Sequence, residues 1–394
     1  MKRIVFLSYY FEPDLSAGSF RNTSLFNELV KQINNNHQID VYTTLPNRYN
    51  SFTMEANTEE TDGNVRIYRI PTPAHKSSMI TQIIGFSYYF KAVLKMNRKL
   101  NCDLVYASSS RLFTAFLGSI LSRWKNSFLY LDIRDIFKET IIDTIKIHYL
   151  SKTFAFLISL IENYTFSRAN HINLISPGFE EYFKRYYNTP LSYFTNGIDE
   201  IFLKDRVKSI LKGPKEVFEI VYAGNIGWSQ ALHKVIPQAA KDLGDRYRFT
   251  IIGDGGAKSE LLQKIEKLEI QNVILFNPIK REELINIYSK SDCMLIHLDK
   301  KPAFEKVIPS KVFELSTYDK PIVAGVSGFP KTFIDKNLSE VYTFQPCSPS
   351  GLVKAILKAR KNSGVVDRED FVKAFSRKNI NKNMAQSILE NIAK

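Results

Sequence analysis

The sequence has few cysteines and lacks a long hydrophobic run. Its three cysteines (Cys102, Cys293 and Cys347) do not have the spacing of metal ligands, so no zinc or iron–sulfur centre is expected and the thiols are predicted to be reduced. The longest apolar stretch, Thr153–Ile161, is well short of the ~20 residues that a membrane-spanning helix needs. The first residues lack the apolar segment and the cleavage site of a signal peptide. We therefore expect a cytoplasmic protein.

Acidic residues are scarce relative to basic ones. Lys and Arg total 54 against 40 Asp and Glu, which gives a formal net charge of +14. Between Asn64 and Cys102 the sequence has seven basic residues and no acidic one. This excess favours an anionic partner, which could be a nucleic acid, a sugar nucleotide or an anionic membrane surface.

The chain is too long for one core. Its 394 residues exceed the roughly 250–300 at which a single core stops growing, which predicts two domains. Strand-like runs alternate with helical ones, as in α/β proteins whose parallel sheets are covered on both faces. The alternation restarts after the Lys-rich stretch Lys204–Lys215. We predict Rossmann-like domains over residues 1–198 and 215–365 that face each other across a cleft, and a helical tail over 366–394 that packs back on the first domain.

Two turns of small residues lie between a strand and a helix. Gly18 precedes a helix after the first strand, and Gly224-Asn225-Ile226-Gly227 follows the first strand of the second domain. The free amides at such helix ends suit a phosphate or a sugar hydroxyl, and Arg21 would add a charge-assisted contact. The alternative for the first turn is an ordinary strand–helix connection with a surface arginine.

The segment IPSKVFELSTYDKPIVAG carries the most specific pattern. Pro309 and Ser310 can start a helix whose free amides, together with the Lys311 ammonium, would face a diphosphate. Glu314 projects from the same face one turn later, and its carboxylate can accept two hydrogen bonds from ribose hydroxyls. A surface lysine and a solvated glutamate are the alternative. The apolar residues between them and the strand that follows place the helix at a sheet edge and favour binding.

The segment LDIRDIF is the candidate for the acceptor side. The strand Phe128–Ile133 delivers Arg134 and Asp135 near its carboxyl end. Asp135 could orient or deprotonate an acceptor hydroxyl, and Arg134 could hold a phosphate or that carboxylate. A structural Arg–Asp pair at the strand end explains the same pattern equally well.

The segment Met79–Asn101 has the pattern of an amphipathic basic helix. It combines isoleucines, phenylalanines and tyrosines with four basic residues and has no acidic one. Such a helix suits the surface of an anionic membrane. A core-packed helix with a solvated basic face is the alternative, and the missing acidic residues favour the membrane.

Four ordered segments of the second half resemble the family 4 glycosyltransferases of the GT-B fold. They are VYAGNIG, FTIIGDGG, NVILFNPIKREELINIYSKSDCMLI and PSKVFELSTYDKPIVAG, and the first half matches more loosely through LDIRDIF and TNGID. Within this family the sequence is similar to bacterial O-antigen and capsule enzymes, including L-fucosamine transferases.

The resemblance implies that a sugar is transferred with retention from a nucleotide sugar. The expected donor is a UDP-sugar carrying an N-acetylated hexosamine or a deoxyhexosamine, and the expected acceptor is a lipid-diphosphate-linked saccharide at the inner face of the membrane. The resemblance places the ribose on Glu314, the diphosphate near Ser310, Lys311 and the Gly224 turn, and the base against the main chain at Ile279. It implies no nucleic-acid partner, no cofactor and no metal, since cationic and helix-end groups can stabilise a leaving diphosphate.

The sequence departs from the family pattern in two places. Many members have a second glutamate eight positions before Glu314, whereas Glu305 lies one position off here and could substitute for it. Many members also have a basic residue soon after the glycine turn, where this sequence has Trp228. Neutralisation of the diphosphate is therefore expected to fall to Lys311 and Arg21.

Three other functions compete with sugar transfer. A sugar-nucleotide 2-epimerase of the same fold would need several carboxylates and a histidine in the cleft, which this sequence does not visibly supply. A nucleic-acid-binding protein would fit the charge, but no recognised motif is present. A dinucleotide oxidoreductase needs a G-x-G-x-x-G turn after the first strand, and the loop after Ile4–Tyr9 lacks that spacing.

Overall fold

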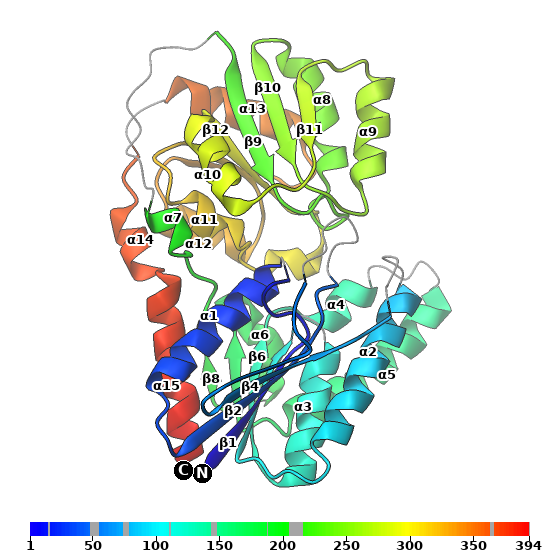
Figure 1. Ribbon diagram of the computed structural model, residues 1–394. Coiled ribbons are helices and arrows are strands. Elements are labelled where there is room, and N and C mark those ends of the chain that lie inside the picture. Colours follow the sequence, from blue (N-terminus) through cyan, green and yellow to red (C-terminus); the bar gives the residue numbers. More distant parts are fainter. Residues whose placement is uncertain are drawn as a thin grey trace. The chain divides into compact units, whose positions relative to one another are not determined.

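The computed structural model describes residues 1–14, 16–47, 55–73, 79–109, 112–142, 148–186, 188–204, 216–362 and 366–393. The predicted linker Lys204–Lys215 lies outside these residues from position 205 onward. The chain divides into two compact units (Figure 1). Unit 1 comprises Met1–Asn196 and Arg377–Lys394, and unit 2 comprises Gly197–Ser376.

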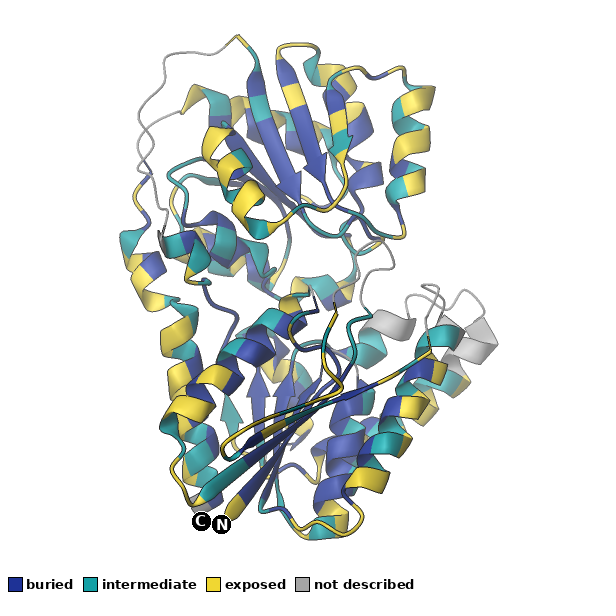
Figure 2. Ribbon diagram, in the orientation of Figure 1, coloured by how far each residue is buried: buried dark blue, intermediate teal, exposed yellow. Residues whose placement is uncertain are grey.

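Unit 1 contains a sheet whose strands lie in the order β3-β4-β2-β1-β5-β6-β7-β8. Neighbouring strands are parallel except for β3, which is antiparallel to β4. The strands are β1 (Lys2–Ser8), β2 (His37–Thr44), β3 (Glu59–Asp62), β4 (Val65–Ile70), β5 (Leu104–Ser109), β6 (Phe128–Ile133), β7 (His171–Leu174) and β8 (Leu191–Ser192). Every residue of β1 after Lys2 is buried, because helices cover both faces of the sheet (Figure 2).

The helices of unit 1 connect these strands. They are α1 (Ala17–Gln32), α2 (Met79–Met96), α3 (Leu112–Lys125), α4 (Phe137–Ile142), α5 (His148–Phe166), α6 (Glu180–Phe183) and α15 (Arg377–Ala393), with the 3-10 turns η1 (Pro177–Phe179) and η2 (Lys184–Tyr186). Ser16 caps the start of helix α1, and its hydroxyl accepts a hydrogen bond from the Ser19 amide at 3.1 Å. Helix α15 packs against α1, and its Met384 and Ile388 are fully buried in the core that includes Leu25.

Unit 2 contains a parallel sheet with the strand order β11-β10-β9-β12-β13-β14. The strands are β9 (Phe218–Ala223), β10 (Tyr247–Ile252), β11 (Val273–Phe276), β12 (Cys293–His297), β13 (Ile322–Gly325) and β14 (Val341–Phe344). The helices are α7 (Ile201–Lys204), α8 (Ile236–Leu243), α9 (Lys258–Lys267), α10 (Arg281–Lys290), α11 (Lys311–Leu315), α12 (Phe329–Asn337), α13 (Pro349–Lys361) and α14 (Glu369–Ala374), with the 3-10 turns η3 (Leu232–Lys234) and η4 (Pro302–Glu305).

Each sheet has one point at which the strand order reverses. In unit 1 this point lies between β1 and β5, and in unit 2 it lies between β9 and β12. Connections to either side leave a crevice at the carboxyl ends of these strands, where open α/β sheets bind ligands. Gly18 was predicted to precede the helix after β1 but lies in the first turn of α1, whereas the Gly224 turn follows β9 as predicted. Both glycines therefore lie beside a reversal point.

Candidate functional site

Two glycine turns of unit 2 interlock at its reversal point. The Gly224 amide donates to the Ile252 carbonyl at 2.8 Å, and the Ile226 amide donates to the Asp254 carbonyl at 2.8 Å. Gly253, at φ 147°, approaches so closely that a Cβ there would lie 1.8 Å from the Gly224 carbonyl oxygen. Only glycine fits this approach, which fixes the turn Gly224–Gly227 against the second turn.

The Asn225 side chain is directed within its own turn. Its Nδ2 donates to Oε1 of Gln230 at 2.7 Å, and its backbone carbonyl accepts a hydrogen bond from the Tyr222 hydroxyl at 2.7 Å. Gly227 leaves the room for this arrangement, because a Cβ there would lie 2.3 Å from the Asn225 Nδ2. Asn225 therefore stabilises the turn, and a contact between Asn225 and a ligand stays a prediction.

The Lys311 side chain lies directly over the turn Gly224–Gly227. A Cβ on Gly224 would be 2.5 Å from Cε and 2.7 Å from Nζ of Lys311, and the ammonium is 5.7 Å from the centre of the Tyr222 ring. Within the described part of the chain no carboxylate pairs with this ammonium. A cation thus rests on a glycine turn without a protein anion to neutralise it, which is a suitable environment for a phosphate group.

The helix that carries Lys311 is short. Ser310 already has helical backbone angles (φ −56°, ψ −27°), and its hydroxyl caps no amide. The Val312 amide donates to the Pro309 carbonyl at 3.0 Å, so the amides of Ser310 and Lys311 precede the first internal bond of the helix. These two amides and the Lys311 ammonium belong to one turn of the chain.

Glu314 is half-buried one turn after Ser310. The Tyr288 hydroxyl donates a long hydrogen bond to its Oε1 at 3.5 Å. Burial raises the pKa of Tyr288 well above its usual value, and the Glu314 carboxylate raises it further, so the phenol stays protonated as a donor. Among the described residues Glu314 has no ion-pair partner, which leaves its carboxylate available to a polar ligand.

Ile279, the predicted contact of the base, is partly buried against the apolar cluster on one side of the sheet of unit 2. Nearby, the Lys258 ammonium donates to Oδ1 of Asn277 at 2.9 Å. The position of a base beside this segment stays a prediction.

His297 at the end of β12 ties two loops of unit 2 to the sheet. Its Nδ1 lies 2.6 Å from the Gln230 carbonyl, and its Nε2 accepts the Cys347 amide at 3.0 Å. This pairing requires a neutral ring with the proton on Nδ1. Burial lowers the pKa of His297 to about 4, so the ring is neutral at physiological pH. The histidine has a structural role next to the turn.

Arg21 of unit 1 is not at the surface, in contrast to both interpretations of its turn. Its guanidinium binds Asp132 with two hydrogen bonds of 3.0 Å and donates to the carbonyls of Phe194 and Thr195 at 2.8 and 2.7 Å. The side chain is 1% exposed. Although burial opposes ionisation, Arg21 holds the pKa of Asp132 below its usual value. The three nitrogens are engaged inside unit 1, so Arg21 is corrected from a diphosphate contact to a structural cation.

The guanidinium of Arg134 packs against Gly18. A Cβ there would lie 2.5 Å from Nη1 of Arg134, so glycine makes room for the arginine. The Nε of Arg134 is buried without a hydrogen-bond partner. Burial lowers the pKa of Arg134, the Asp132 carboxylate raises it, and the second cation at Arg21 lowers it further. Gly18 and Arg134, predicted for different roles, therefore meet at the carboxyl edge of the first sheet.

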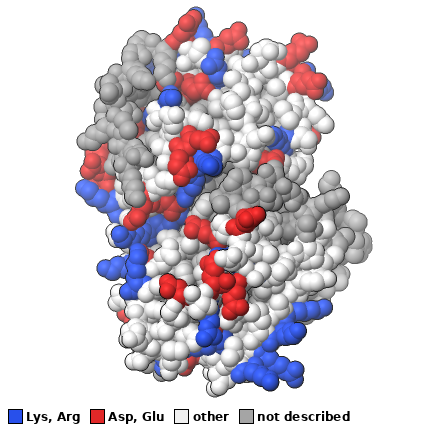
Figure 3. Space-filling view, in the orientation of Figure 1, with Lys and Arg blue, Asp and Glu red and all other residues white. Residues whose placement is uncertain are grey.

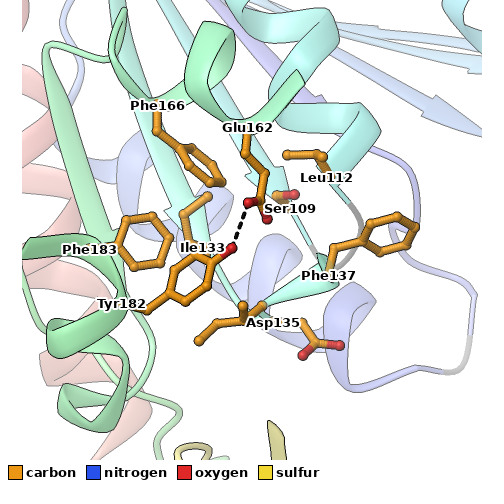
Figure 4. A pocket seen from close by; sticks show the side chains of 10 residues that line it. Ser109, Leu112, Ile133, Asp135, Phe137, Glu162, Phe166, Tyr182 and Phe183 are labelled. Atoms are coloured by element: carbon orange, nitrogen blue, oxygen red, sulfur yellow. Dashed lines mark hydrogen bonds between the residues drawn. The ribbon is translucent and has the colours of Figure 1, made fainter. Parts of the chain in front are cut away.

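Asp135 lies at one side of a small pocket of unit 1 (Figure 4). The other side holds Glu162 of α5, which accepts a hydrogen bond from the Tyr182 hydroxyl at 2.5 Å and pairs with Arg185 at 3.2 Å. Burial raises the pKa of Glu162. In Figure 4 the Asp135 carboxylate points away from Glu162, so the two acids do not form a pair.

Comparison with known proteins identifies the second half. Residues 204–378 match the family described as Glycosyl transferases group 1. This part of the chain is therefore similar to group 1 glycosyltransferases.

A curated relative matches over a shorter stretch. WcaI of Escherichia coli (strain K12), whose assignment as a colanic acid biosynthesis glycosyl transferase is provisional, is 31% identical over 108 residues. This match covers 27% of the chain and spans about a quarter (26%) of the length of that relative.

Solved structures match the whole chain. Sucrose-phosphate synthase from Thermosynechococcus elongatus aligns with a TM-score of 0.76 at 13% identity and covers 100% of both chains. Anabaena Alr3699/HepE in complex with UDP aligns with a TM-score of 0.64 at 13% identity, over 99% of this chain and 100% of the other. These likenesses show the GT-B fold, which confirms the fold class predicted from the ordered motifs.

Two of the residues predicted for the donor site, Gly224 and Lys311, are in contact in unit 2. Glu314 lies on the same short helix as Lys311, and its role toward a ligand stays a prediction. Tyr288, which contacts Glu314, was not singled out, because a tyrosine in the middle of a helix gives no local signal. Glu162 of unit 1 was not singled out either, because a single glutamate within a helix gives no local signal. Among the described helices, none combines the length and apolarity that crossing a bilayer requires.

Proposed function

We propose that the chain is a retaining glycosyltransferase that moves a sugar from a UDP-sugar to a lipid-diphosphate-linked saccharide in the synthesis of a surface polysaccharide such as O-antigen or capsule. The transferred sugar is an N-acetylated hexosamine or a deoxyhexosamine. The observation that carries the proposal is the unneutralised Lys311 ammonium over the Gly224 turn, at the reversal point of a group 1 glycosyltransferase domain. WcaI and the UDP complex of Alr3699/HepE support the pathway class and the nucleotide.

In this proposal the donor is held by two neighbouring contacts. The Lys311 ammonium and the amides of Ser310 and Lys311 bind the diphosphate and stabilise the charge that develops on UDP as it leaves. The Glu314 carboxylate accepts hydrogen bonds from the ribose hydroxyls. The hydrogen bond from the Tyr288 hydroxyl orients this carboxylate. No metal is required, because the charge on the leaving group is met by Lys311 and by backbone amides.

The acceptor half of the reaction falls to unit 1. Asp135 orients or deprotonates the attacking hydroxyl, and Arg134, with an unpaired buried Nε, holds a phosphate of the acceptor. Retention follows when the hydroxyl attacks the face of the sugar that the diphosphate leaves. The chain acts at the cytoplasmic face of the membrane, to which it binds peripherally.

Thermal unfolding with a panel of UDP-, GDP-, TDP- and ADP-sugars tests the donor. Binding to the folded state at one hundred times the dissociation constant adds about 2.7 kcal/mol, which raises the melting temperature by roughly 5–10 °C for a domain of this size. We expect UDP-sugars to give the largest shift. Stabilisation by an oligonucleotide at moderate salt, with no shift from any nucleotide sugar, would contradict the proposal.

Two substitutions assign the roles. Glu314→Ala should weaken UDP binding and nearly abolish transfer, whereas Tyr288→Phe, which removes only the hydroxyl, should have a smaller effect on both. Asp135→Asn should leave UDP affinity unchanged and slow turnover by about 10²–10⁴-fold. Unchanged turnover in Asp135→Asn would rule out the base but not the donor site.

A further inference from the structure

Three helices lie side by side on one face of the sheet of unit 1 (Figure 1). Phe86 of α2 contacts Phe113 of α3 with ring centres 5.8 Å apart, and Phe116 of α3 contacts Tyr164 of α5 at 5.7 Å. Helix α3 therefore packs between α2 and α5, and the two outer helices flank it on the same side of the sheet.

The outer surfaces of α2 and α5 are apolar. In α2 the inward positions Gly85, Tyr89 and Val93 are buried, whereas most of the exposed side chains in the first part of the helix are large and hydrophobic. Six apolar side chains of these helices are at least 45% exposed: Ile83 50%, Ile84 45%, Tyr88 56%, Phe156 62%, Leu157 51% and Leu160 50%. We call these six residues the apolar face.

The topology places the two halves of the apolar face at the same edge of the sheet. Helix α2 lies between strands β4 and β5 in sequence, and α5 lies between β6 and β7. The two strands of each pair point the same way, so both helices run back against the strand direction. Their first turns therefore lie at the carboxyl edge of the sheet. The apolar face belongs to the first two thirds of each helix and is thus on the side where β6 delivers Arg134 and Asp135.

Basic residues follow the apolar face toward the other edge. Lys91, Lys95 and Arg98 are exposed on α2 and after it, and the Lys125 ammonium at the end of α3 donates to the Arg98 carbonyl at 3.0 Å. Figure 3 shows Lys and Arg gathered over this end of α2. In the sequence of α2, α3 and α5 the single acidic residue is Glu162, which is buried and paired with Arg185.

We propose that the apolar face and the basic residues beside it form a surface that docks on an anionic phospholipid bilayer. The six apolar side chains insert at the level of the headgroups, and Lys91, Lys95 and Arg98 contact lipid phosphates. Charge complementarity selects the lipid over a second copy of the chain, because a symmetric pair of these surfaces would bring two basic clusters together.

This surface deepens the proposed function and rests on it. Docking through α2 and α5 brings the carboxyl edge of the first sheet, with Asp135, toward the bilayer from which a lipid-linked saccharide protrudes. The sequence pattern pointed to residues 79–101 alone. Helix α5 contributes half of the apolar face and was not predicted.

Vesicle co-sedimentation of the full chain tests the surface. We expect binding to vesicles of phosphatidylethanolamine with phosphatidylglycerol, and little binding to vesicles of phosphatidylcholine alone. Lys91→Gln with Lys95→Gln should weaken this partitioning about 25-fold, since each basic residue near the surface contributes about fivefold. Phe156→Ser with Leu157→Ser and Leu160→Ser should abolish it.

Two controls keep the test interpretable. Leu262→Ser with Leu357→Ser removes apolar side chains of similar exposure (45% and 47%) from unit 2 and should leave vesicle binding unchanged. Circular dichroism and UDP binding of each variant should match the parent chain, because none of these residues belongs to the donor site.

Three results would overturn the docking surface. They are equal binding to neutral and anionic vesicles, unchanged binding of the α5 variant, and a dimer in sedimentation velocity that the α5 variant dissociates. A failure of the proposed function would give a different result: neither the parent chain nor the variants would bind UDP or transfer sugar to a water-soluble acceptor. Loss of vesicle binding with retained transfer to that acceptor would support the surface.

Discussion

In unit 1 the first turn of α1, at Gly18, is covered by the Arg134 guanidinium, while Arg21 on the same helix is bound to Asp132 in the interior. In unit 2 the turn at Gly224 is covered by Lys311, whose ammonium has no carboxylate partner among the described residues. Both turns follow the strand next to a reversal point, and both have a cation nearby. The two cations differ because only Arg21 has an acidic partner within the part of the chain that the structure describes. Asp132 on β6 binds the Arg21 guanidinium in a structural ion pair.

The first prediction breaks the buried pair of unit 1. Arg21→Ala leaves the Asp132 carboxylate buried without its cation and should destabilise the chain by about 3–5 kcal/mol. Urea unfolding followed by circular dichroism measures this loss. The double variant Arg21→Met with Asp132→Asn should recover part of it, since no uncompensated charge remains. If Arg21→Ala unfolds like the parent chain, the cation is not structural.

The second prediction compares alanine substitutions at two tightly packed glycines, Gly253 of unit 2 and Gly18 of unit 1. Gly253→Ala places a Cβ 1.8 Å from a backbone oxygen and should cost about 3 kcal/mol. Gly18→Ala meets the end of the flexible Arg134 side chain, which can move, and should cost less. Thermal unfolding of both variants gives the order. An equal or larger loss in Gly18→Ala would show that the Arg134 position is fixed.

The third prediction is that the stabilities of the two units depend differently on pH. Unfolded His297 binds a proton near its ordinary pKa of 6.5, whereas folded His297 binds it only near 4. The free energy of unfolding of unit 2 should therefore fall as the pH is lowered through this window, by about 2 kcal/mol between pH 7 and pH 5. The Asp132 pKa is lowered instead, so its contribution in unit 1 is retained until the pH falls below about 4.

The two tryptophans of the chain report this difference, since Trp124 belongs to unit 1 and Trp228 to unit 2. Urea titrations of Trp124→Phe follow the emission of Trp228 and should show the pH dependence. His297→Gln should remove most of it. A pH dependence that persists in His297→Gln would assign the effect to other groups.

The fourth prediction concerns Lys311 of unit 2. Lys311→Ala removes a charge-assisted contact to phosphate and should weaken UDP binding about tenfold, while its unfolding free energy changes by no more than about 0.5 kcal/mol. Isothermal titration calorimetry with UDP and urea unfolding give the two quantities. The reverse result, a large loss of stability with unchanged affinity, would give Lys311 the same role as Arg21.

The sequence predicted which residues lie together in unit 2 better than it did in unit 1, for a physical reason. In unit 2 the residues that matter stand in short ordered segments, so strand, glycine turn and cation are visible together. In unit 1 the partner of Arg21 is 111 positions away on β6, and Arg134 meets Gly18 across 116 positions. Local patterns cannot reveal such long-range pairs, and both readings of Arg21 assumed that it was at the surface.

Surface roles were the hardest to assign. The periodicity of residues 79–101 indicated an amphipathic helix. The exposed apolar residues of α5, in contrast, lie in a segment whose sequence is typical of a core helix. Only the structure shows that Phe156, Leu157 and Leu160 face away from the sheet.

The return of α15 to α1 has a consequence for synthesis. Unit 2, Gly197–Ser376, is contiguous and has all its residues before residue 377 leaves the ribosome. Unit 1 is translated first, yet the pocket that receives Met384 and Ile388 stays unfilled until the last helix emerges. The usual order, in which the amino-terminal domain matures first, is therefore inverted. A nascent chain stalled before residue 377 would expose the apolar side of α1, including Leu25 and Leu29, although all residues of unit 2 have been synthesised.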